Sequence, residues 1–157
     1  MCGIVGFIDK NRVLKNDDMG GLLDCLVRRG PDNQSFQIHQ GEYGTTYLGH
    51  ARLKIIDLSD EANQPISSIN SEHHIIFNGE IYNYKSLQQK CISLGAKFTT
   101  DSDTEVVLKT FELFGIEKTL KLLDGMFAFA IFNSKTGEII IARDRFGQKP
   151  LYFGTQK

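Results

Sequence analysis

The sequence predicts an α+β fold in which antiparallel sheets are covered by helices. Apolar segments of strand length come in pairs separated by turn residues, and helical segments also come in pairs. This order favours antiparallel sheets over a doubly wound parallel sheet, in which strands and helices alternate. The chain has 157 residues, 41% hydrophobic and 24% charged, as in ordinary globular domains. Because no linker or low-complexity stretch interrupts it, we expect residues 1–157 to form one domain.

The first half of the chain begins with an apolar segment, residues 3–8, that predicts a buried strand. A helix is expected to start at Asp17-Asp18 and to end before Pro31, because proline disfavours helix at the preceding residue. Its apolar face is formed by Met19, Leu22, Leu23, Leu26 and Val27. Three short strands are then expected at residues 35–39, 43–50 and 53–57, with Gly41 and Gly44 marking turns.

The second half begins with a strand at residues 74–77 that we expect to end in an Asn78-Gly79 turn. Two helices follow, at residues 84–94 and 102–114. Gly95 is placed to cap the first helix, and Gly115 is placed to stop the second. The last two predicted strands, residues 125–132 and 138–142, are joined by a turn over residues 133–137.

Charge and hydropathy argue against several classes of protein. The net charge is −1, so the surface has no basic field that would attract a nucleic acid. The longest apolar run, residues 126–132, is far shorter than the roughly 20 residues that cross a bilayer. The first residues lack the basic and apolar regions of a signal peptide, so we expect a cytoplasmic protein with reduced thiols.

The cysteine and histidine residues do not form a metal-binding or disulfide pattern. Three widely spaced cysteines fit neither a disulfide framework nor a zinc site, and Cys25 and Cys91 are expected to be core thiols. The four histidines also lack metal-ligand spacing, so structural or surface roles are expected for them: His39, His50, His73 and His74.

Cys2 is the first candidate for a catalytic group. Removal of the initiator methionine would place its thiol and a free α-amine on one residue. A thiol ordinarily has a pKa of about 8.5 and an α-amine about 7.7–8.0, so the amine can accept the thiol proton near neutral pH. This is the arrangement of an N-terminal nucleophile, which needs no histidine. The alternative is a small buried thiol at the start of a strand.

Four further residues suggest the binding and activation of an amino-acid substrate. The amide of Asn78 and the N–H of Gly79 offer two donors for an oxyanion, although Asn-Gly is also the commonest hairpin turn. Arg52, in a segment with few other charges, suits a carboxylate. Asp103 suits an ammonium group, or else it caps the helix that follows.

Taken together, the motifs resemble the glutaminase domain of glutamine-dependent asparagine synthetases. Eight collinear segments that span the whole chain carry this resemblance, and together they are more specific than any short motif. They are Met1–Gly6, Arg29–Asp32, His50–Leu53, Phe77–Tyr84, Ser102–Glu105, Leu123–Phe129, Arg143–Gly147 and Lys149–Tyr152.

The resemblance implies a class II glutamine amidotransferase with the N-terminal-nucleophile hydrolase fold, a four-layer αββα sandwich. In this family Cys2 matches the nucleophile and its α-amine the base, and Asn78 and Gly79 match the oxyanion pair. The matching positions for substrate binding are Arg52, Leu53, Lys54, Ile55, Ile56, Asn78, Gly79, Glu80 and Asp103, and residues 53–56 would contribute main-chain groups. The substrate would be L-glutamine, and its hydrolysis to glutamate and ammonia would require no metal or organic cofactor.

The chain also departs from the family. The Ser-Gly-Gly-x-Asp-Ser loop of the ATP-using synthetase domain has no match, so ATP and magnesium are expected only in a separate synthetase domain or subunit. Because the sequence stops at Lys157, where relatives usually add a strand, we expect a C-terminally truncated domain whose open sheet edge allows self-association. Two alternative functions stay open. The chain could be the glutaminase part of another amidotransferase, or a non-catalytic remnant that binds a partner.

Overall fold

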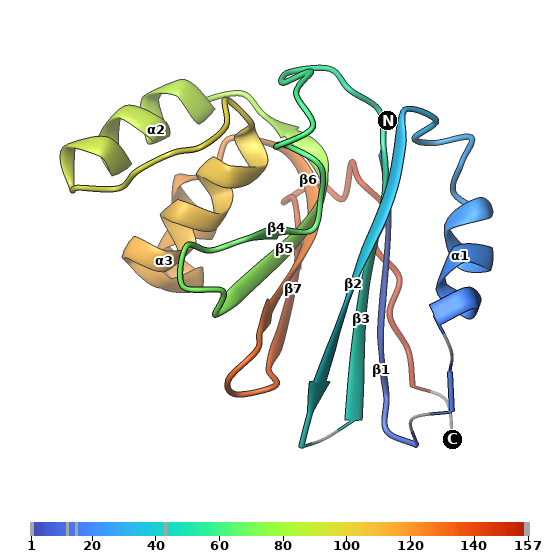
Figure 1. Ribbon diagram of the computed structural model, residues 1–157. Coiled ribbons are helices and arrows are strands. Elements are labelled where there is room, and N and C mark those ends of the chain that lie inside the picture. Colours follow the sequence, from blue (N-terminus) through green and yellow to red (C-terminus); the bar gives the residue numbers. More distant parts are fainter. Residues whose placement is uncertain (1, 12, 15, 43, 156–157) are drawn as a thin grey trace.

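The protein folds into four layers, helix–sheet–sheet–helix (Figure 1). The computed structural model describes residues 2–11, 13–14, 16–42 and 44–155, without the side chains of residues 16 and 17. The first sheet has the order β1-β3-β2 and the second the order β4-β5-β6-β7, with antiparallel neighbours throughout. The α+β sandwich expected from the sequence is therefore confirmed.

The first half of the chain forms one sheet and its covering helix, and the second half forms the other sheet and its two helices. The first sheet contains β1 (Gly3–Asp9), β2 (Asn33–Gly41) and β3 (Gly44–Arg52), and α1 (Asn16–Asp24) covers its outer face. The second sheet contains β4 (Ile66–Ser67), β5 (His73–Ile81), β6 (Gly125–Asn133) and β7 (Ile139–Arg143). On its outer face lie α2 (Tyr84–Ser93) and α3 (Asp103–Leu122).

Strand alternation in β5 explains how the core and the site share one sheet. Ile75, Phe77 and Ile81 belong to the large cluster that packs the second sheet against α2 and α3. Ile76 belongs instead to a small cluster between the two sheets. Because successive side chains of a strand point to opposite faces, Asn78 extends on the same face as Ile76, toward the first sheet.

Three predictions of local structure were wrong. The first helix, expected to continue to just before Pro31, ends at Asp24, so Leu26 and Val27 lie outside it. Residues 53–57 form an irregular loop and not a strand, because the Arg52 side chain bonds the carbonyls of Asp57 and Ser59 and curls the loop around itself. The expected Asn78-Gly79 turn is part of β5. The strand continues to Ile81 because each of its residues pairs with one of β6.

The prediction for Gly95 is confirmed, whereas Gly115 kinks α3 and does not end it. Gly95 has a φ of 92° and follows α2, and Gly115, with a φ of 73°, interrupts α3 with a kink. Beyond the kink, helix that the sequence did not predict continues to Leu122. The prediction that a strand begins at Tyr43 concerns a residue outside the described ones, and β3 is described from Gly44.

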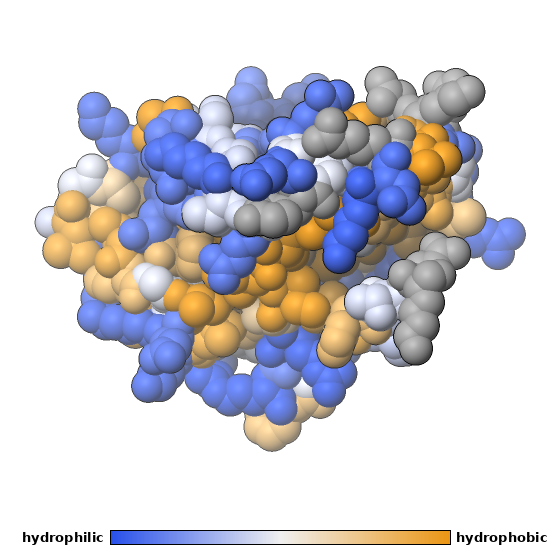
Figure 2. Space-filling model, turned by 90° about the horizontal axis from the view of Figure 1, so that it is seen from below, coloured by the Kyte–Doolittle hydropathy of each residue, from blue (hydrophilic) through white to orange (hydrophobic). Residues whose placement is uncertain are grey.

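The molecular surface carries an apolar area at the end opposite Cys2. Figure 2 shows the molecule from below, with hydrophobic residues gathered in the centre of that face and hydrophilic residues around them. Within the described part of the chain, no helix has the length and hydrophobicity of a membrane span.

Candidate active site

Cys2 lines a pocket next to the end of β3. The start of β1 pairs with the end of β3, Gly3 opposite Ala51, so Cys2 is brought beside the Arg52–Leu53 segment. The N–H of Leu53 donates to the Cys2 sulfur over 3.4 Å, and the thiol lies 3.7 Å from the Leu53 carbonyl oxygen. The sulfur is half-buried and lines the pocket, so it is not packed away in hydrocarbon.

Arg52 is buried and organises the loop that follows it. One guanidinium nitrogen donates to the Ser59 carbonyl (2.6 Å) and to Oδ1 of Asn63 (2.7 Å), and the other donates to the Asp57 carbonyl. Among the described hydrogen bonds, these three use three of the five N–H groups of the side chain. The guanidinium is therefore held rigidly at the pocket wall, and two of its N–H groups remain for a ligand.

The edge of β5 that faces the pocket presents N–H groups to it. The Phe77 N–H donates to Oε1 of Gln64 (2.6 Å), and the Ile81 N–H donates to Oδ2 of Asp103 (3.0 Å). Alternate residues of a strand direct their N–H groups to the same side, so the Gly79 N–H points to this edge as well. β4 pairs only with Ile75 and His74, so this edge is open to the pocket at Gly79.

The Asn78 side chain is 4% exposed and lines the same pocket. Its Oδ1 is buried and has no hydrogen-bond partner among the described residues. Gly79 is required by packing as well, because a Cβ there would lie 2.3 Å from the carbonyl oxygen of Met126 on β6. The backbone at this point can therefore approach both β6 and a ligand closely.

Asp103 lies at the start of α3, facing β5. The alternative role as helix cap is wrong for Asp103, because Ser102 is the N-cap and accepts from the Thr104 N–H. The pKa of Asp103 is raised to about 6, chiefly by burial and also by the nearby Glu80 carboxylate, while the N–H groups of Ile81 and Thr104 act in the opposite direction. A cation between the two carboxylates would relieve their repulsion.

The segment before Asp103 is held by Glu105. The buried Glu105 carboxylate accepts from the backbone N–H and the hydroxyl of both Thr99 and Thr100. All four residues of the Ser102–Glu105 motif therefore have polar partners. Together they fix the helix start on which Asp103 stands.

The Arg29–Asp32 motif supports the nucleophile side of the pocket. Nε of Arg29 donates to the Cys2 carbonyl over 3.1 Å. The N–H of Asp32 donates to the Arg52 carbonyl (3.0 Å), and its carboxylate accepts from the Lys54 N–H (2.8 Å). Gly30 lies against the β3 backbone, where a Cβ would be 2.1 Å from the Ala51 oxygen. This turn therefore holds Cys2 and the start of the loop in place.

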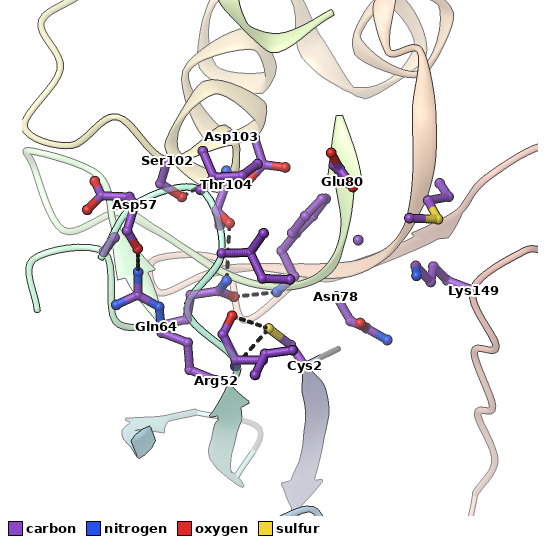
Figure 3. A pocket seen from close by; sticks show the side chains of 17 residues that line it. Cys2, Arg52, Asp57, Gln64, Asn78, Glu80, Ser102, Asp103, Thr104 and Lys149 are labelled. Atoms are coloured by element: carbon purple, nitrogen blue, oxygen red, sulfur yellow. Dashed lines mark hydrogen bonds between the residues drawn. The ribbon is translucent and has the colours of Figure 1, made fainter. Parts of the chain in front are cut away.

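The structure brings all but one of the residues expected at the site to a single pocket (Figure 3). The pocket is lined by Cys2, Arg52, Leu53, Ile55, Ile56, Asn78, Gly79, Glu80 and Asp103. Lys54 does not line it, because its Nζ turns away to form an ion pair with Asp60 over 2.7 Å. Glu80 and Asp103 lie together on one side of the pocket, and Cys2 lies on another.

Sequence reasoning missed several residues that line this pocket. Gln64 joins Phe77 to Thr104 across its wall. Lys149, 2% exposed, lies on the side of Asn78 (Figure 3), and Met126 belongs to the facing strand β6. The Lys149–Tyr152 motif was a signal for Lys149, but Gln64 lies in a stretch that carried no motif.

Other polar groups fall outside the pocket. Within the part of the chain that is described, no three His, Cys, Asp or Glu residues are grouped to hold a metal ion. Burial lowers the pKa of His50 to about 3 and that of His74 to about 4, so both imidazoles are neutral at physiological pH. Cys91 is a core thiol as expected, whereas Cys25 is exposed, because α1 ends one residue before it.

The family model of the glutamine amidotransferase domain matches residues 1–157. "Asparagine synthetase [glutamine-hydrolyzing] 1" of Bacillus subtilis is 42% identical over 99% of this chain, and a putative glutamine-hydrolysing asparagine synthetase of Methanocaldococcus jannaschii is 35% identical over 98%. This chain spans 24% and 32% of their respective lengths.

A solved structure shares the fold. The glutamine phosphoribosylpyrophosphate amidotransferase of B. subtilis matches 65% of this chain with a TM-score of 0.55 and 29% identity, and the match covers 24% of that enzyme.

Proposed function

Because the chain belongs to the glutamine amidotransferase domain family, we propose that it hydrolyses the side-chain amide of L-glutamine to glutamate and ammonia. The observation that carries this proposal is the convergence of Cys2, Arg52, the Asn78–Glu80 edge and Asp103 on one pocket. These groups derive from both sheets and from α3. They supply a nucleophile, a carboxylate-binding group, hydrogen-bond donors for the oxyanion and ammonium-binding groups. Binding and hydrolysis of a zwitterionic amide require all of these.

The first step is attack of the Cys2 sulfur on the amide carbon. After removal of Met1, the α-amine of Cys2 accepts the thiol proton. The Leu53 N–H, 3.4 Å from the sulfur, stabilises the thiolate that forms. The amide C–N bond then breaks, the proton passes from the α-ammonium to the leaving nitrogen, and ammonia departs. Water hydrolyses the thioester, which releases glutamate and restores the thiol.

The negative charge on the amide oxygen is stabilised at the β5 edge. The Gly79 N–H opens to the pocket, and the Asn78 side chain lies on the face of β5 that points toward the first sheet. Donors placed in advance, in a site shielded from water, stabilise this charge more strongly than water does. The donor that Asn78 offers to the oxyanion is its side-chain amide nitrogen, because the buried Oδ1, which has no hydrogen-bond partner among the described residues, can only accept.

The two charged ends of glutamine define the rest of the pocket. The α-carboxylate binds to the guanidinium of Arg52, which the loop carbonyls hold rigidly in place. The α-ammonium binds to Glu80 and Asp103, whose mutual repulsion it relieves. Leu53, Ile55 and Ile56 line the wall between these groups. Hydrolysis of this kind proceeds without a metal ion or an organic cofactor.

The ammonia is proposed to serve asparagine synthesis on a synthetase domain or subunit, in the cytoplasm. The relatives that support this acceptor are named as glutamine-hydrolysing asparagine synthetases and cover nearly the whole chain. A phosphoribosyl acceptor is the alternative suggested by the solved amidotransferase, although its match covers only 65% of the chain. Without an acceptor, the chain acts as a glutaminase.

Glutamate release by the purified chain tests the proposal. Cys2→Ala should abolish release, because no other thiol of the described residues lines the pocket. Cys25→Ala is the matched control, since that thiol is exposed and outside the pocket, and its rate should equal that of the parent. Intact mass must show that Met1 is absent from the active material. Equal release by the parent and Cys2→Ala would refute catalysis and leave the non-catalytic alternative.

A further inference from the structure

We propose that Gln64 is a positioning residue of this site, which fixes the donor edge of β5 relative to the start of α3. The inference rests on the proposed glutaminase function. Gln64 is 5% exposed and belongs to the loop between β3 and β4. It bonds through its side chain and through its backbone, and it touches three different elements.

The side-chain amide bridges β5 and α3. Oε1 accepts from the Phe77 N–H over 2.6 Å, and Nε2 donates to Oγ1 of Thr104 over 3.1 Å (Figure 3). Phe77 directly precedes Asn78, and Thr104 directly follows Asp103. The side-chain amide of Gln64 therefore sets the distance between the proposed oxyanion donors and the proposed ammonium-binding carboxylate.

The backbone of the same residue is tied to the first sheet. The Gln64 carbonyl accepts from the hydroxyl of Ser35 on β2, which pairs with β3. The first sheet carries Cys2 and Arg52 at its pocket end. Gln64 therefore connects the part of the molecule that holds the nucleophile to the part that holds the oxyanion donors.

The position of Gln64 along the β5 edge determines what it can do. The N–H groups of Phe77, Gly79 and Ile81 point to the same side, and Gln64 and Asp103 hold the first and the last of them. The N–H between them, that of Gly79, is left for a ligand. Without Gln64, the buried Phe77 N–H would lose its acceptor, and the strand edge would shift to find another.

Gln64→Met tests the inference, because methionine preserves the shape of the side chain and removes both bonds. At a temperature where the variant is folded, kcat/KM for glutamine should fall roughly tenfold to a hundredfold, as expected for a misplaced reacting group. Thr104→Val, which breaks only the bond to α3, should mainly raise KM, because α3 carries Asp103. This variant keeps the test decisive if Gln64→Met fails to fold.

Gln37→Met is the matched control. Gln37 is a partly buried glutamine on β2 that donates to the Pro65 carbonyl and to Ser67, and it does not line the pocket. The Gln37→Met substitution should change kcat and KM by less than about twofold. It should lower the melting temperature, as loss of ordinary hydrogen bonds does. If Gln64→Met behaves in the same way, Gln64 is merely structural and the inference is overturned.

Amide hydrogen exchange separates this inference from the proposed function. In Gln64→Met, the peptide covering residues 77–81 should exchange faster, whereas in Gln37→Met it should keep the protection of the parent. If the parent releases no glutamate, the proposed function fails, and the exchange result still decides whether Gln64 positions the edge. Unchanged protection of residues 77–81 in Gln64→Met would contradict the inference.

Discussion

The charge of Asp103 depends on pH in the mildly acidic range. Burial raises the pKa of its carboxyl group to about 6, well above the usual value, and Glu80 acts in the same direction. The group is therefore ionised at pH 7 and becomes neutral at mildly acidic pH. A neutral carboxyl group loses the charge that would attract an ammonium group, so substrate binding in the proposed reaction depends on pH in this range.

The expected result is a rise in KM for glutamine as pH falls below about 6. One pH unit below the pKa, about nine-tenths of Asp103 is protonated, so kcat/KM should fall roughly tenfold for each further unit. Asp103→Asn should have a high KM at pH 7 and should lose this acidic limb. Initial rates of glutamate release between mildly acidic and neutral pH provide the measurement.

Asp101→Asn is the control for this profile. Asp101 is exposed, two residues away, and outside the pocket. The pH dependence of kcat/KM of Asp101→Asn should overlay that of the parent. An acidic limb that persists unchanged in Asp103→Asn would show that another group controls it.

At the scale of single residues, the sequence predicted most of the pocket, through the resemblance to a family. The side chains that touch the proposed substrate carry recognisable chemistry, such as a second-position cysteine or an isolated arginine. Gln64 was not predictable, because its role depends on where three elements meet. Lys54 was predicted to line the pocket, but its contact with Asp60 could not be read from the sequence.

At the scale of elements, the turn over residues 28–32 determines how Cys2 is presented. Gly30 packs directly against the β3 backbone, with no room for a Cβ between its Cα and the Ala51 carbonyl. Both sides of this contact are main chain, so neither can yield by rotating a side chain. Its neighbours Arg29 and Asp32 bond the backbone of Cys2, Arg52 and Lys54.

Gly30→Ala should destabilise the protein by about 1–3 kcal/mol or more, because overpacking displaces the backbone. Chemical denaturation monitored by circular dichroism measures this change. Gly20→Ala in α1 is the control, since a Cβ there meets nothing within 4 Å. That change should stabilise the helix by roughly 0.5–1 kcal/mol, the usual difference between the two residues. Equal stability of the two variants would contradict the close contact at Gly30.

Local patterns predicted most elements, and they failed where tertiary contacts override them. Ile55 and Ile56 favour a strand, yet the bonds of Arg52 curl residues 53–57 into a loop. Asn78-Gly79 is typical of a hairpin, yet pairing with Ala128 and Phe127 keeps the strand extended. Likewise, Asp144 lies between two arginines in the sequence, yet its carboxylate accepts four backbone N–H groups.

At the scale of the whole molecule, the outer strands of the sheets matter for association. Within the described residues, β1 pairs only with β3, so its other side has no strand partner. The face opposite the pocket also carries an apolar area (Figure 2). An unpaired strand edge favours pairing with another chain, and an exposed apolar area favours association as well.

Self-association that rises with protein concentration is therefore expected, and Ile8→Lys should reduce it. Ile8 lies on β1 and is 39% exposed, and a lysine on an edge strand opposes edge-to-edge pairing. Val13→Lys is the control, because Val13 is 72% exposed but lies outside the strand. Sedimentation velocity over a wide concentration range measures the effect. A parent that stays monomeric throughout would disprove the expectation.

The division of the pocket between two sheets has a consequence for how the protein loses activity. Cys2 and Arg52 belong to one half of the sandwich, whereas Asn78, Glu80 and Asp103 belong to the other. Among the described residues, the halves meet through a small apolar cluster and a few hydrogen bonds between β2 and the segment that leads into β4. A slight slippage of one sheet against the other would separate the reacting groups before any strand or helix melts. On heating, turnover should therefore disappear at a lower temperature than the circular dichroism signal, because activity requires the two sheets to stay aligned.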